Sequence, residues 1–194
     1  MSTGRSRIGW INLKDSVFIA VLAGLSFIVE NSLGLILLPL TSSIPLIGGT
    51  LSAIPDGAII FLGAYLVPRR GAIFLFAIIL LSLSIVTPGF GPPGIYKIVI
   101  GVALGLLFEI LLLVRDTTAA HIIITGVVFS ASIPVTYFAW VWFGLPGVTL
   151  LRPKLPILMG IYLIEGILGA LLGNYLYRSR LSQLSAVRRI RSVS

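Results

Sequence analysis

Five charged side chains stand inside runs of apolar residues: Glu30, Asp56, Lys97, Glu109 and Glu165. In a bilayer each of them needs a partner, a ligand or a water-filled space, because a charge at the centre of a spanning helix costs about 2.5 to 3.5 kcal/mol on insertion scales. Carboxylates in such places attract cations, and aromatic faces add cation–π contacts that strengthen when water is excluded. These residue types therefore favour binding of a small polar or cationic organic molecule.

The segments that carry these charges have the composition of a membrane protein. Of the 194 residues, 57% are hydrophobic and only 10% are charged, whereas soluble domains carry roughly 25% charged residues. A chain this short cannot hide so much apolar surface in one core, which disfavours a water-soluble globule. Cysteine is absent, so a disulfide framework and a thiolate metal site are excluded. We expect no metal and no cofactor.

Six apolar stretches predict the architecture, since a spanning helix needs about 20 mostly apolar residues. They cover residues 14–40, 54–68, 72–87, 95–114, 119–143 and 155–177, and a basic tail follows over 178–194. The second stretch is short, and an alternative is that it begins nearer Leu46 with a kink at Pro55. The predicted fold is all-α: a single membrane domain over residues 1–194, built as a bundle of six transmembrane helices.

The basic residues predict how this bundle is oriented. A net charge of +8 would suggest nucleic acid in a soluble chain, but here the basic residues lie between the apolar stretches, and we expect no nucleic-acid partner. Six spans with both termini cytoplasmic agree with the positive-inside rule. They place eleven of the 14 basic residues inside: Arg5, Arg7, Lys14, Arg69, Arg70, Arg115, Arg178, Arg180, Arg188, Arg189 and Arg191. The predicted location is the cell membrane, with the lipid bilayer around a multi-pass chain.

With that orientation, a rise of about 1.5 Å per residue places several polar and aromatic residues at one depth toward the outer face. The candidate substrate-binding residues are Glu30, Asn31, Asp56, Tyr96, Lys97, Tyr137, Trp140, Tyr162 and Glu165. Other roles compete for some of them. Tyr96, Lys97 and Trp140 fit equally well as interfacial anchors, and Asp56 fits as a helix cap. Glu30 and Glu165 lie deeper, where an internal ion pair or a ligand contact is expected; Glu109 falls in the inner half, where an internal hydrogen bond or a partner contact is expected.

Short motifs give the chain a family resemblance. They are the small residues Ala20, Ala23 and Gly24, the Pro/Gly-rich loop 87–94, and the helix that follows with Gly101, Gly105 and Glu109. A small, basic, six-helix membrane protein with these features and no ATP-binding motif resembles the substrate-binding S components of energy-coupling factor (ECF) vitamin transporters. Within that family it is most similar to the hydroxymethylpyrimidine/thiamine-type members.

The resemblance implies a binding subunit that captures a water-soluble vitamin or vitamin precursor from outside. It also implies that uptake is driven by partners, namely a transmembrane coupling protein and two ATPase subunits. Ala20, Ala23 and Gly24 would form the interface with the coupling protein, although Gly24 departs from the Ala-x-x-x-Ala pattern of the family. The carboxylate and aromatic set favours a cationic heterocycle such as thiamine, whereas Lys97 would suit an anionic vitamin.

Two other functions stay open. The first is a stand-alone channel or secondary carrier, although the chain has no evident inverted repeat. The second is an intramembrane lipid enzyme with His121 or the carboxylates as acid–base groups. The sequence has neither a G-x-S-x-G elbow nor an H-E-x-x-H motif, which favours a transport protein without enzymatic activity.

Overall fold

The computed structural model describes residues 9–41, 50–87, 91–114, 117–146 and 148–179. The helices are α1 (Leu13–Thr41), α2 (Thr50–Leu66), α3 (Ala72–Leu83) with the 3-10 turn η2 (Ser84–Val86), α4 (Tyr96–Val114), α5 (Thr118–Trp142), α6 (Val148–Leu151) with the 3-10 turn η3 (Arg152–Lys154), and α7 (Leu155–Ser179). Within these ranges the chain forms no strand beyond one isolated bridge between Trp10 and Arg70. The predicted all-α fold is confirmed.

Within the described ranges, four helices are long and apolar enough to cross a membrane: Leu13–Gly34, Tyr96–Val114, Thr118–Trp142 and Val148–Ser179. Two further apolar helices, Ser52–Leu66 and Ala72–Val86, are shorter. This supports a helical membrane bundle. Crossing about 30 Å of hydrocarbon needs about 20 helical residues, and the two shorter helices fall below that length, so six full spans stay a prediction. The cytoplasmic location of the termini also stays a prediction.

The second helix is described from Thr50, four residues before the predicted start at Ile54, and Pro55 lies inside it. The alternative start nearer Leu46 lies outside the described residues. Asp56 is therefore not in the first turn of its helix, so the predicted alternative of a helix cap is wrong for this carboxylate.

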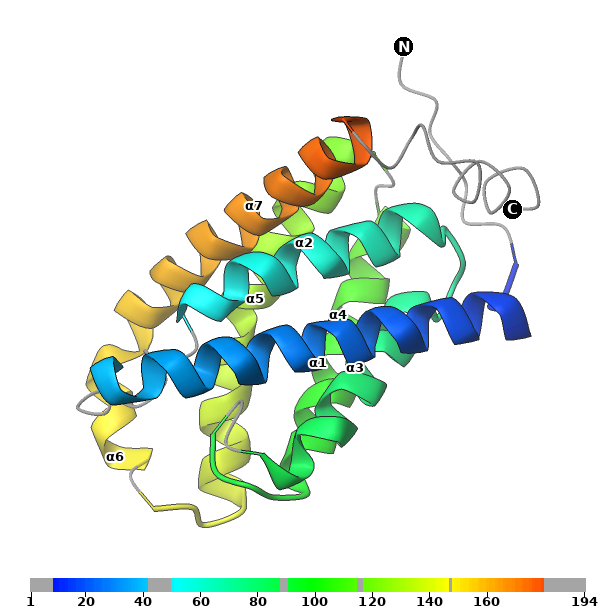
Figure 1. Ribbon diagram of the computed structural model, residues 1–194. Helices are drawn as coiled ribbons and strands as arrows, with labels where there is room; N and C mark the ends of the chain where they lie inside the picture. Colours follow the sequence, from blue (N-terminus) through cyan, green and yellow to red (C-terminus); the bar gives the residue numbers. More distant parts are fainter. Residues whose placement is uncertain (1–8, 42–49, 88–90, 115–116, 147, 180–194) are drawn as a thin grey trace.

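The helices form one bundle in which α2 lies among α1, α3, α5 and α7 (Figure 1). α1, α3 and α5 run toward the end of the bundle that carries α6, and α2, α4 and α7 start there. We call this the α6 end and the opposite end the Arg69 end. At the Arg69 end, the Arg69 Nε lies 3.5 Å from a carboxylate oxygen of Asp15, and the Arg70 amide donates to the Gly9 carbonyl at 3.2 Å.

Small residues allow α2 and α7 to approach closely. A Cβ atom on Gly166 would lie 2.9 Å from the Gly126 Cα of α5, and one on Gly173 would lie 2.7 Å from the Ala58 carbonyl of α2. On α4, a Cβ on Gly101 or on Gly105 would lie 3.0 Å from the backbone of α3. The small-residue faces of the fourth and sixth predicted spans therefore pack inside the chain.

Candidate functional site

Three buried carboxylates from three helices converge in the half of the bundle nearer the α6 end. Glu30 of α1 is 6% exposed, Asp56 of α2 is 4% exposed and Glu165 of α7 is 9% exposed. Tyr162, almost one turn before Glu165, is within electrostatic range of all three, and Glu30 is within range of Asp56. We call Glu30, Asp56 and Glu165 the carboxylate cluster. The sequence predicted all four residues, and the fold brings them together.

Local geometry explains why the cluster forms. Tyr162 and Glu165 are three residues apart on α7, so they lie on the same face of that helix. The next residue, Gly166, lies against Gly57 of α2, which follows Asp56 directly. The close approach of α2 and α7 at these glycines therefore sets Asp56 beside the Tyr162–Glu165 face.

A serine that the sequence prediction missed joins α1 to the cluster. The Ser26 hydroxyl donates to the Asp56 Oδ1 at 2.5 Å, and Ser26 is fully buried. Ser26 lies four residues before Glu30, so one face of α1 presents both side chains to α2. The same spacing recurs on α2, where the buried Ser52 precedes Asp56 by four residues. A hydroxyl one turn before a carboxylate in an apolar stretch is the signal that could have found Ser26.

Two of the cluster's oxygens have no hydrogen-bond partner in the part of the chain that the structure describes. The Glu30 Oε2 and the Glu165 Oε2 are buried and have no hydrogen-bond partner among the described residues. Buried polar groups are nearly always hydrogen-bonded, and leaving one unpaired costs about 1 to 3 kcal/mol, more for a charged group. These two atoms therefore mark where a ligand or a proton would be stabilising.

Lys97 borders the cluster, and its ammonium donates to carbonyls at the end of a helix. Its side chain is 0% exposed, and its Nζ donates to the Ser84 carbonyl at 2.9 Å and to the Thr87 carbonyl at 2.6 Å. These carbonyls end α3 and η2, where a cation complements the helix dipole. Lys97 also lies within electrostatic range of Glu30. The predicted alternative of a headgroup anchor is wrong for Lys97, because the ammonium points into the bundle.

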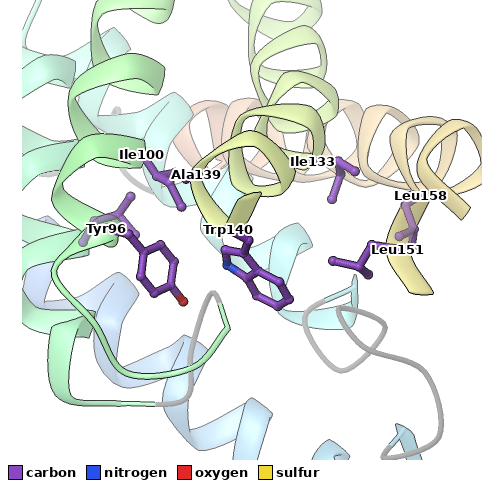
Figure 2. Packing of buried hydrophobic residues seen from close by; sticks show 8 residues of the cluster. Tyr96, Ile100, Ile133, Ala139, Trp140, Leu151 and Leu158 are labelled. Atoms are coloured by element: carbon purple, nitrogen blue, oxygen red, sulfur yellow. The ribbon is translucent and has the colours of Figure 1, made fainter. Parts of the chain in front are cut away.

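Tyr96 and Trp140 form a buried aromatic pair near Lys97 (Figure 2). Their ring centroids are 6.4 Å apart and their planes are almost perpendicular. The Tyr96 hydroxyl donates to the Pro92 carbonyl at 2.6 Å. Both rings are buried, so the predicted alternative of an interfacial belt is wrong for this pair.

Two predicted site residues have no described contact with the cluster. The Asn31 side chain donates to the Phe27 carbonyl of its own helix at 2.8 Å. The Tyr137 ring packs against Phe138, with centroids 5.6 Å apart, and against the hydrophobic core near Trp140. The structure thus assembles Glu30, Asp56, Tyr162 and Glu165, with Lys97 beside them. Tyr137 and Tyr162 pack against the same hydrophobic core, so a role for Tyr137 and Asn31 in the site stays a prediction.

Glu109 makes hydrogen bonds inside the chain, which is one of the two roles that the sequence predicted for it. Its Oε1 accepts from the Ile73 amide at 2.9 Å and from the Phe74 amide at 3.4 Å. Both amides belong to the first turn of α3 and have no acceptor within that helix. Glu109 therefore caps α3.

His121 lies apart from the carboxylate cluster. It is buried near the Arg69 end, edge-on to Phe61 and Tyr65 with centroid distances of 6.3 and 6.2 Å. Tyr65 follows Asp56 by nine residues on α2, which is about 14 Å of helical rise. An acid–base pair of His121 with the cluster is therefore not assembled.

The predicted partner interface is only partly accessible. Ala23 is fully buried in the core, whereas Ala20 and Gly24 are half-buried, and a Cβ on Gly24 would meet no atom within 4 Å. Of the three residues, Ala20 and Gly24 are the two that a partner could touch.

In the described part of the chain, no group of three His, Cys, Asp or Glu side chains could hold a metal ion. Comparison with family models, with curated proteins and with solved structures finds no match for the chain.

Proposed function

We propose that this chain is a substrate-binding membrane subunit of the ECF type and that the carboxylate cluster binds a small, water-soluble organic cation. A vitamin or vitamin precursor with a cationic ring, such as thiamine, is the proposed substrate class. The observation that carries the proposal is the convergence of three buried carboxylates on Tyr162. Uptake would need a transmembrane coupling protein and two ATPase subunits.

The balance of charge supports a cationic ligand. The cluster contains three acidic groups, and the one buried cation beside it, Lys97, donates to two backbone carbonyls. Ionised carboxylates in a bilayer need compensation, and a positively charged ligand supplies it. An anionic vitamin, which Lys97 considered alone would suit, is disfavoured because Glu30 lies within electrostatic range of that ammonium.

The exposed surface of α1 around Ala20 and Gly24 is a second proposed site, at which the coupling protein would dock. Ala20 and Gly24 lie on an α1 surface that also exposes the large apolar residues Val17, Val21 and Ile28. Small residues four apart let a second helix approach closely, so this surface is the proposed contact for the coupling protein.

Ligand binding to the purified protein tests the function. The protein in lipid nanodiscs is titrated with thiamine, its pyrimidine precursor, neutral pyridoxine and anionic biotin while thermal unfolding is followed. A cationic ligand at 100 times its Kd should stabilise the fold by about 2.7 kcal/mol, and biotin should not.

The matched variants are Glu165→Gln, which removes a cluster charge, and Glu109→Gln, which makes the same change away from the cluster. We expect the first to lose cation binding and the second to keep it. Equal binding by both variants, or stabilisation by biotin alone, would contradict the proposal. Solute flux into liposomes that contain this chain alone would favour the secondary carrier instead.

A further inference from the structure

The ionisable groups around the cluster come from four helices. Glu30 lies on α1, Asp56 on α2, Tyr96 and Lys97 on α4, and Tyr162 and Glu165 on α7. α3 has no ionisable side chain, and η2 contributes only carbonyls to Lys97. The ionisable residues of α5 are Tyr137, which packs beside Phe138, and His121 near the Arg69 end. The described surroundings thus set one ammonium against three carboxyl groups.

The single positive charge of Lys97 cannot neutralise three ionised carboxylates. Its Nζ is 2.9 and 2.6 Å from two carbonyl oxygens that carry the negative end of a helix dipole. Its Nζ also lies within electrostatic range of Glu30, and one ammonium can neutralise one of the three carboxylates. At full ionisation two negative charges would be left buried in the bundle, and a bilayer does not stabilise such charges without a partner.

The three carboxyl groups are not equivalent. Asp56 receives the Ser26 hydroxyl at 2.5 Å, so this carboxylate has a donor supplied by the fold. Glu30 and Glu165 each have a buried Oε2 with no partner among the described residues. A proton on either glutamate removes its charge at no cost in packing.

We propose that the carboxylate cluster exchanges protons for its organic cation: Glu30 and Glu165 hold protons in the empty site, and binding of the cation releases at least one of them. This inference deepens the proposed function, and the binding of the cation rests on that function. In the exchange one O–H bond of a carboxylic acid breaks, the carboxylate pairs with the bound cation, and the proton passes to water. No other covalent bond changes, and no oxidant or reductant is involved.

The consequence is that binding depends on pH. Protons and the cation compete for the same oxygens, so acid weakens binding and alkali strengthens it. For each proton released, the Kd should fall up to about tenfold per pH unit. A site whose carboxylates stay ionised when empty would bind the cation with the same Kd over this range.

The proposed protonation of Glu30 and Glu165 can be tested without any ligand. A hydrophobic carbodiimide reacts with protonated carboxyl groups in apolar surroundings, and mass spectrometry of the digested wild-type protein locates the adduct. We expect adducts on Glu30 or Glu165 whose yield falls as the pH rises. Glu109, which accepts two backbone amides, serves as the internal control and should react far less. Absence of adducts on Glu30 and Glu165 at every pH at which the protein stays folded would overturn the inference.

The exchange itself is tested by calorimetric titration with thiamine as the probe, in two buffers of different ionisation enthalpy. Proton release appears as a difference in observed heat, and thiamine should also protect the reactive glutamate from the carbodiimide. If adducts form but no cation in the panel binds, the proposed function fails. If thiamine binds with equal heats and a pH-independent Kd, the exchange fails and the binding function stands.

Discussion

Lys97 and Glu109, twelve residues apart on α4, bind opposite ends of α3. Lys97 donates to the carbonyls of Ser84 and Thr87 just beyond the last turn, and Glu109 accepts the amides of Ile73 and Phe74 in the first turn. Each charge complements the helix dipole at its own end. Two of the five charges in apolar stretches thus stabilise the fold, and the other three, Glu30, Asp56 and Glu165, are the carboxylates that we propose bind a ligand.

Replacing Glu109 by leucine should destabilise the fold without affecting ligand binding. The change leaves the Ile73 and Phe74 amides without their acceptor, and we expect the free energy of unfolding to fall by about 1 to 3 kcal/mol. Chemical unfolding in detergent measures this. Glu109→Gln keeps an acceptor oxygen and should lose much less; an equal loss in both variants would show that α3 does not depend on this cap.

Lys97→Met should be more damaging, and at alkaline pH its damage should depend on Glu30. Once Glu30 has lost its proton, removing the ammonium breaks a buried charge pair, which costs about 3 to 5 kcal/mol, so we expect a large loss of unfolding free energy there. Adding Glu30→Gln should recover part of this loss, because the carboxylate left without its cation is removed. A double-mutant cycle at alkaline pH gives the coupling, with the exposed Lys14→Met as control. Strict additivity at that pH would contradict the Lys97–Glu30 interaction.

Gly91→Ala should disturb the aromatic pair at the α6 end. Gly91 has a φ of 101°, and a Cβ atom there would overlap the Trp140 ring and lie 2.8 Å from the Tyr96 hydroxyl oxygen. Backbone strain alone costs about 1 to 3 kcal/mol. Gly144→Ala carries similar strain, with a φ of 64°, but meets no atom within 4 Å. Tryptophan fluorescence should therefore shift in Gly91→Ala more than in Gly144→Ala, and equal spectra would contradict this packing.

The sequence predicted the helices well because apolar length dominates in a membrane chain. The described helices begin and end near the predicted stretches, apart from the earlier start of α2, and the short α6 lies in what was expected to be a loop. Depth along each helix was enough to group Glu30, Asp56, Tyr162 and Glu165. It also grouped Asn31 and Tyr137, whose described contacts are with Phe27 and Phe138.

The parts of the site that the sequence did not predict depend on which way each side chain points around its helix and on the conformation of the connections. Asn31 is one residue after Glu30, so it is turned by about 100° on the helix, and depth alone cannot separate the two. Lys97 reaches the carbonyls of Ser84 and Thr87 only when the end of α3 and η2 packs beside the start of α4. Likewise, Ser26 gains its role only when α1 packs beside α2.

We propose that the carboxylate cluster binds an organic cation. Native mass spectrometry of the protein, purified gently from cells grown in rich medium, tests this binding most directly, because the retained molecule can be identified by mass and charge. We expect a small organic cation on the wild-type protein and on Glu109→Gln, and its loss from Glu165→Gln. An empty wild-type protein, a bound anion, or a cation that Glu165→Gln retains in full would contradict the proposed binding.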